Sequence, residues 1–156
     1  MLLRTHIAFC VLGLLLIIPF VSHKATFVCV ALFATIFPDF DTRFSKYGKN
    51  LIARTMQVFT KHRGAVHSLT MCLIFSLILA MFFPIAALGF FTGYSFHLIA
   101  DSFTQMGIIV FWPIKKFTAK GVIETGKFGE KIIFLCLMFV NILLSAFYLV
   151  SYFRVV

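Results

Sequence analysis

The sequence predicts an all-α membrane protein, a polytopic bundle of about five transmembrane or membrane-embedded helices forming one domain over residues 1–156. Hydrophobic residues make up 62% of the chain, and 22 residues are Phe. A soluble domain of this length could not bury so much apolar surface, whereas a bilayer can cover it. Charged residues make up only 12%, and they cluster between long uncharged stretches.

The formal net charge of +9 fits a membrane protein better than a nucleic-acid-binding protein. Cytoplasmic loops of membrane proteins carry excess Lys and Arg, and they face anionic lipid headgroups. No soluble segment combines basic and aromatic residues in the stripe typical of nucleic-acid binding. We therefore expect the lipid bilayer as a partner and no nucleic acid.

The five predicted helices follow from the uncharged stretches. Arg4 and the apolar run after it have the charge and core of a signal peptide, but no small-x-small cleavage site follows, so we expect a retained first helix. The stretch 68–114 is too long for one span of ~20 residues, and Pro84 with Gly89 marks a hairpin within it. Ser68 is the expected N-cap after the loop. The predicted helices cover residues 7–22, 25–38, 68–83, 86–111 and 132–153, the second being short for a full span.

The two basic loops, 39–67 and 115–131, are separated by two predicted helices and therefore lie on the same side of the membrane. The positive-inside rule makes that side cytoplasmic. The sequence thus predicts a multi-pass protein of the cell's inner membrane, with its amino terminus and its active site facing the cytoplasm. On this topology, four segments far apart in sequence bring polar side chains to the cytoplasmic side: His6, Asp39, Asp41, His62, Arg63, His67, His97 and Asp101.

In the motif "HLIAD", His97 and Asp101 lie four residues apart, so a helix places them on one face with Cβ atoms roughly 6 Å apart. A charged Asp inside a membrane helix costs about 2.5–3.5 kcal/mol, which a bound cation would offset. The alternative is a His–Asp hydrogen bond that only steadies the bundle.

The motif "FPDFD" places Asp39 and Asp41 in a turn after the second predicted helix. They are either solvated loop acids and caps or functional groups. The chain has only five acidic residues, and three of them are Asp39, Asp41 and Asp101, which favours function. The other two, Glu124 and Glu130, lie among lysines and are expected to be ordinary loop charges.

In the motif "HRGAVHS", His62 and His67 lie five residues apart, and Gly64 between them allows a bend that turns both inward. Arg63 is either one more inside-positive charge or a planar fork for a phosphate or for charge on a reacting oxygen.

Charge balance favours one divalent ion, because three neutral imidazoles and two carboxylates bring two negative charges: His6, His67, His97, Asp39 and Asp101. Mixed His and carboxylate ligands suit zinc most, and also manganese or iron. Asp41 remains as general base, as support for a ligand, or as ligand to a second ion. A metal-bound water with a pKa of ~7 is a nucleophile at neutral pH, so hydrolysis is the expected reaction.

The amino-terminal His6, "FPDFD", "HRGAVHS" and "GYSFHLIADSFTQMGIIVFWP" together resemble the YdjM-like family of LexA-regulated, membrane-bound metal-dependent hydrolases, over about residues 1–113. The order His, Asp, His, HxxxD is also similar to that of the zinc-dependent phospholipase C and nuclease group. These resemblances imply phosphodiester or phospholipid hydrolysis and the five ligands named above. The HxxxE motif of that soluble group is missing after Asp101, which implies a site for one or two ions. Residues 114–156 carry no catalytic motif.

Two other classes of function remain open from the sequence. An ion or small-solute transporter would bind its cargo at His97 and Asp101, but it would be expected to spread polar groups through the membrane depth. A non-catalytic membrane protein with a structural metal site is the third class.

Overall fold

The computed structural model describes residues 1–39, 63–114 and 117–155, and this part of the chain is mostly helical, as predicted. Its longer helices are α1 (Leu3–Ile17), α2 (Lys24–Ile36), α6 (Leu69–Phe82), α7 (Pro84–Ser102) and α8 (Phe128–Val155). The shorter elements are η1 (Ile18–Phe20), η2 (Phe37–Asp39), α5 (Arg63–Val66), β1 (Ile108–Ile109) and β2 (Thr118–Ala119).

Two of the described helices are long and apolar enough to cross a membrane, Leu3–Phe20 and Phe128–Phe153. The helices α2 and α6 have 13 and 14 residues, fewer than the ~20 of a full straight span. Large apolar side chains cover the outer faces of α6 and α8, where Met81 is 80% exposed and Phe147 64%. Such continuous apolar surface is costly in water and suits contact with lipid.

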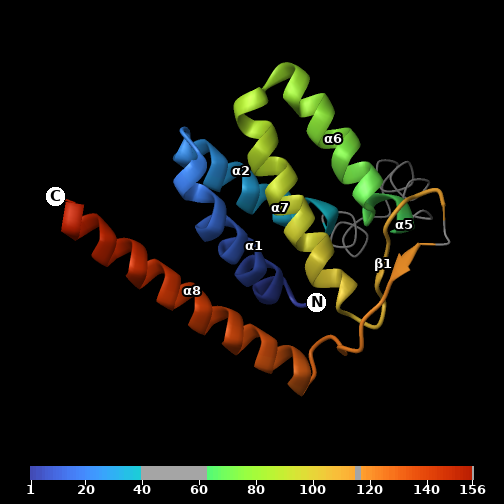
Figure 1. Cartoon of the computed structure of the whole chain (residues 1–156). Coiled ribbons are helices and arrows are strands. Elements are labelled where there is room, and N and C mark those ends of the chain that lie inside the picture. Colours follow the sequence, from blue (N-terminus) through green and yellow to red (C-terminus); the bar gives the residue numbers. More distant parts are fainter. Residues whose placement is uncertain (40–62, 115–116, 156) are drawn as a thin grey trace, which may run out of the picture.

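The helix α7 lies at the centre of the fold and packs against α1, α2 and α6 (Figure 1). Its closest neighbour is α2, because Gly89 and Gly93 present no side chain to that helix. A Cβ atom on Gly93 would lie 2.0 Å from the carbonyl oxygen of Ala31, and one on Gly89 would lie 2.8 Å from that of Phe27. Small residues four apart allow two helix backbones to approach closely in a membrane. His97 lies one turn further along the same face of α7.

The predicted hairpin at Pro84 and the predicted N-cap at Ser68 are both confirmed. The helix α6 ends at Phe82 and α7 begins at Pro84. The backbone N–H of Met71 donates to Oγ of Ser68 at 3.3 Å, which satisfies one of the free donors at the start of α6.

The predicted helix over 86–111 is wrong in its last third, because α7 ends at Ser102. The hydroxyl of Thr104 donates to the carbonyl oxygen of Asp101 at 2.7 Å, and Gly107 adopts a φ of 63°, a conformation that a helix does not use. The chain then forms β1, which pairs antiparallel with β2 through Ile108 opposite Ala119. Hydropathy could not show this ending, because the strand is as apolar as the helix before it.

The helix α8 starts beside the amino terminus and diverges from α1 toward its own carboxyl end (Figure 1). The amino terminus also lies next to the carboxyl end of α7 (Figure 1). The starts of α1 and α8 therefore meet at the end of α7 that carries His97 and Asp101.

Candidate metal centre

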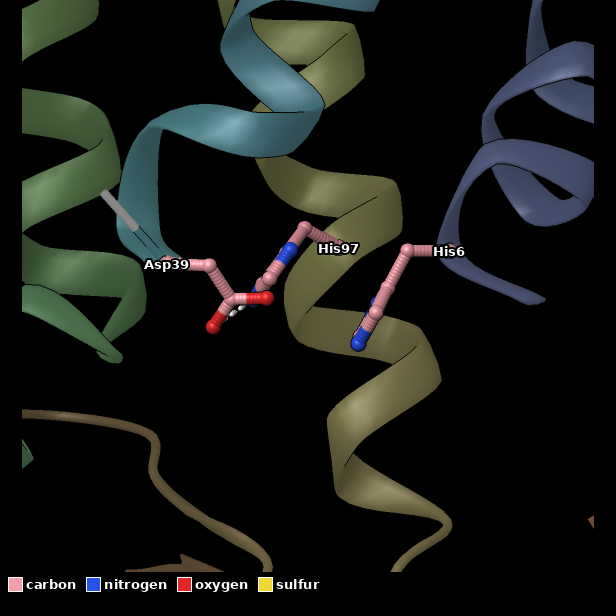
Figure 2. A group of neighbouring side chains, drawn as sticks. All are labelled: His6, Asp39 and His97. Atoms are coloured by element: carbon pink, nitrogen blue, oxygen red, sulfur yellow. Dashed lines mark ion pairs between the residues drawn. The ribbon is translucent and has the colours of Figure 1, made fainter. Parts of the chain in front are cut away.

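The five predicted ligands come together at one end of the bundle, although they belong to separate segments of the chain. Figure 2 shows His6 on α1, Asp39 at the end of η2 and His97 on α7, with their side chains directed into one space. The potential ligand atoms of these three residues all lie within 4.8 Å of one another. The same holds for His67, His97 and Asp101.

The carboxylate of Asp101 lies between three imidazoles. Its Oδ1 is 3.4 Å from Nε2 of His6, and its Oδ2 is 3.5 Å from Nε2 of His97 and 3.9 Å from Nε2 of His67. Asp39 Oδ1 is 3.5 Å from Nε2 of His67 and 4.0 Å from that of His97. Zinc binds N and O ligands at about 2.0–2.1 Å, which places the ligand atoms of a tetrahedral site about 3.3 Å apart. The observed separations are close to that value.

The hydrogen bond of His97 fixes which of its nitrogens faces the carboxylates. Nδ1 lies 2.8 Å from the carbonyl oxygen of Thr35. Because a carbonyl only accepts, Nδ1 carries the proton, and in the neutral ring Nε2 is left with a lone pair. Nε2 is buried and makes no hydrogen bond in the described part of the chain. A lone pair aimed at two carboxylates is unfavourable until a cation lies between them, so these residues fit a metal ion.

The packing of two rings agrees with neutral imidazoles. The rings of His6 and His97 stack with centroids 4.1 Å apart and an interplanar angle of 9°. Two protonated rings at that distance would repel strongly in a buried site, so the pair favours at least one neutral ring.

Asp39 is the last residue of η2, beyond the end of α2, and its side chain is 28% exposed. Burial alone would raise the pKa of its carboxyl, but the hydrogen bond with His67 and the nearby imidazoles of His97 and His6 outweigh burial and hold that pKa below its usual value. Asp39 is therefore a carboxylate at neutral pH, as a metal ligand must be. The amino group of Met1 lies 2.9 Å from Oδ1 of Asp101, so a cation already stands beside that carboxylate.

The ligand group opens into a cavity of about 570 Å³. This volume is within the range of small-molecule sites. Met1 and four of the predicted ligands line the cavity: His6, Asp39, His67 and Asp101. The segments around β1 and β2 supply the other lining residues: Thr104, Met106, Gly107, Ile108, Ile109, Thr118, Lys120 and Thr125.

Local contacts hold His67 in place. The hydroxyl of Tyr94 on α7 donates to the carbonyl oxygen of Val66, the residue before His67. Ser68, the residue after it, donates its hydroxyl to the carbonyl oxygen of Ala65. The turn between α5 and α6 is thereby fastened to α7, the helix that carries two of the other ligands.

Glu130 is not an ordinary loop charge, which corrects the expectation from its lysine-rich surroundings. Its side chain is 1% exposed at the start of α8. Its carboxylate accepts hydrogen bonds from the backbone N–H of Leu2 at 2.6 Å, the hydroxyl of Thr5 at 2.8 Å and the backbone N–H of Gly126 at 2.6 Å. Thr5 precedes His6, so Glu130 ties the start of α1 to α8 beside the ligand group. An acidic residue in the first turn of a helix was the available sign of a structural role.

Three predicted site residues are not placed. Asp41 and His62 lie outside the described residues, and Arg63 is described only as the first residue of α5. Their catalytic roles stay predictions.

A family model matches nearly the whole chain. Residues 1–155 match the family model described as YdjM inner membrane protein. No curated protein and no solved structure matches the chain.

Proposed function

Because the chain belongs to the YdjM family of inner membrane proteins, we propose that it is a membrane-bound, metal-dependent hydrolase acting at the cytoplasmic face of that membrane. The observation that carries the proposal is the buried Nε2 of His97, which makes no hydrogen bond within the described residues and faces the carboxylates of Asp39 and Asp101. Such an arrangement is costly without a cation and favourable with one.

The proposed ligands share one divalent ion, most suitably zinc, with manganese or iron as alternatives. They are His6, Asp39, His67, His97 and Asp101. With three neutral imidazoles and two carboxylates, a divalent ion balances the charge of its own ligands, which lowers the cost of burying them. When bound, the metal would supply a Lewis acid and lower the pKa of a bound water to about 7.

The chain's own residues would then orient and activate the substrate. Asp41 is the proposed general base, and His62 is the proposed second proton-transfer group. Arg63 would hold a phosphate oxygen with its planar guanidinium. The proposed substrate is a phosphodiester, either a phospholipid or a small molecule, because cationic groups and a Lewis acid stabilise the charge on phosphoryl oxygens.

We propose a multi-pass arrangement in which all five longer helices are embedded in the membrane. The basic residues of the two long loops support a cytoplasmic position for the site and the amino terminus. The shortness of α2 and α6 is compatible with tilt or local thinning of the bilayer, at a modest energetic cost.

Metal content tests the proposal. The detergent-purified protein would be loaded with zinc, desalted and analysed for bound metal, alongside Asp101→Ala, His67→Ala and His23→Ala. His23 is the matched control, an exposed histidine at the opposite end of the bundle. We expect stoichiometric zinc in the parent and in His23→Ala, and its loss in the two site variants.

Hydrolysis of bis(4-nitrophenyl) phosphate by the same four proteins gives the second readout. Activity that follows the zinc content supports a hydrolase. Equal zinc content in all four proteins would refute the site, and site-dependent zinc without any hydrolysis across a phosphodiester and phospholipid panel would leave a structural metal site instead.

A further inference from the structure

We propose that Lys120 forms an anion subsite in the cavity beside the ligand group, and that this subsite receives the singly charged phosphate of a diester. The inference rests on the proposed function, since it names the substrate class of the same site. It assigns a binding role to the carboxyl-terminal part of the chain, in which the sequence showed no catalytic motif.

The position of Lys120 is the first argument. Lys120 lines the same cavity as His6, Asp39, His67 and Asp101. It is the one Lys or Arg among the described lining residues. Within the described part of the chain, no carboxylate forms an ion pair with it. An ammonium group that faces a cavity without a carboxylate partner is available to an anionic ligand.

The backbone on both sides of Lys120 is fixed against the end of α7, which is the second argument. Gly121 donates its N–H to the carbonyl oxygen of Thr104 at 3.0 Å. A Cβ on Gly107 would lie 2.5 Å from Cγ of Lys120, and one on Gly121 would lie 2.0 Å from the carbonyl oxygen of Phe103. The stem of the lysine therefore packs on a backbone that leaves room for it only because position 107 is a glycine.

This attachment couples the lysine to the ligand group. Thr104 follows Asp101 by three residues, and its hydroxyl donates to the carbonyl oxygen of Asp101 at 2.7 Å. The same hydroxyl accepts the N–H of Gly107 at 3.3 Å. Hydrogen bonds thus join the segment that carries Asp101 to the segment that carries Lys120, so the backbone at Lys120 is fixed relative to that ligand.

Charge favours an anionic ligand. Three neutral imidazoles, two carboxylates and a divalent ion sum to zero, and two further cationic groups line the cavity, Lys120 and the amino group of Met1. The cavity is therefore positively charged and suits a phosphate. The diester is the phosphate class of the proposed function. Thr118 and Thr125 line the same cavity as Lys120.

The test measures binding of a soluble diester that does not hydrolyse readily, dimethyl phosphate, to the zinc-loaded protein in detergent. The variants are Lys120→Ala, Lys120→Arg and the matched control Lys127→Ala. Lys127 is an exposed lysine of the same segment that does not line the cavity. We expect Lys120→Ala to weaken binding about tenfold or more, because a charge-assisted hydrogen bond is lost. Lys120→Arg should keep most of the affinity, and Lys127→Ala should equal the parent.

The source of the phosphate is tested with the same proteins in mixed micelles that contain phosphatidylglycerol. Lys120-dependent hydrolysis of phosphatidylglycerol, without Lys120-dependent binding of dimethyl phosphate, identifies a phospholipid headgroup. Lys120-dependent binding of dimethyl phosphate, without Lys120-dependent hydrolysis of phosphatidylglycerol, identifies a soluble diester. Either result supports the subsite.

Zinc content, measured on the same samples, separates this inference from the proposed function. Equal affinity of parent and Lys120→Ala for the diester, with zinc bound in both, overturns the subsite and leaves the metal site intact. Lys120-dependent diester binding in a protein that holds no zinc supports the subsite and overturns the metal-dependent hydrolase. Absence of both zinc and diester binding overturns both.

Discussion

Replacing Glu130 with Gln should destabilise the fold at the point where α1 meets α8. Two donors, the N–H of Leu2 and the hydroxyl of Thr5, share Oε1, and the N–H of Gly126 uses Oε2. Gln has one oxygen and one NH₂ group, so in either orientation at least one backbone N–H faces another donor. A buried donor left without an acceptor costs about 1–3 kcal/mol.

Thermal unfolding in detergent measures this cost. For a chain of this size, 1 kcal/mol corresponds to about 2–4 °C in Tm, so Glu130→Gln should lower the Tm by about 2–12 °C. The matched control is Glu124→Gln, because Glu124 is exposed and its side chain accepts from Gln105 at 3.3 Å. Exposed substitutions of that kind change stability by less than about 0.5 kcal/mol.

Zinc affinity reports whether Glu130 also positions the site. Leu2 and Thr5 both bond to Glu130 just before His6, so disturbing this anchor should loosen that imidazole and weaken zinc binding roughly 10–100-fold, as is usual for residues that orient a ligand. If Glu130→Gln and Glu124→Gln have the same Tm and the same zinc affinity, the assignment of Glu130 as a buried tie between α1 and α8 is refuted.

Three more predictions concern the packing of α7 and the effect of metal. Gly93→Ala should lower the free energy of unfolding by about 1–3 kcal/mol or more and weaken zinc binding, because its new Cβ meets the backbone of α2. The control Gly129→Ala should change the Tm little, because nothing lies within 4 Å of a Cβ at that position. Tyr94→Phe should lower the free energy of unfolding by about 0.5–1.5 kcal/mol, measured by circular dichroism melting, because the hydrogen bond to Val66 is lost. It should also reduce zinc affinity, because Val66 precedes the ligand His67. Equal zinc affinity in parent and variant would show that this hydroxyl does not position the ligand. Free zinc at 100 times its Kd should stabilise the parent by about 2.7 kcal/mol but should not stabilise Asp101→Ala. The stabilisation of the parent should fall on acidification, because the ligands take up protons. A zinc-induced Tm shift that is the same in both proteins would contradict the site.

The sequence was enough to predict the helices and the gathering of the ligands. Uncharged stretches bounded by basic loops placed the long helices, and Pro84 placed the hairpin between α6 and α7. The ligands could be grouped because topology alone sends His6, Asp39, His67 and His97 to one end of the bundle. Ser68 could be assigned as an N-cap from its position before an apolar run.

Hydropathy and spacing could not supply what depends on partners distant in sequence. The carboxyl end of α7 was missed because Ile108 and Ile109 continue its apolar character while their hydrogen bonds go to β2. Glu130 was misjudged because its three donors come from the chain's start and from the turn before α8. The sequence around Gly93 does not indicate that this residue packs against the backbone of Ala31. The orientation of the His97 ring depends on the backbone carbonyl of Thr35, which is also distant in sequence.

X-ray absorption spectroscopy of the zinc-loaded protein in detergent tests the central claim most directly. The account predicts a first shell of N and O atoms only, at about 2.0–2.1 Å, with the outer-shell scattering of several imidazoles. Asp101→Ala should lose this spectrum and His23→Ala should keep it. A sulfur shell at about 2.3 Å, or a zinc spectrum without imidazole scattering, would contradict a centre built from His6, Asp39, His67, His97 and Asp101.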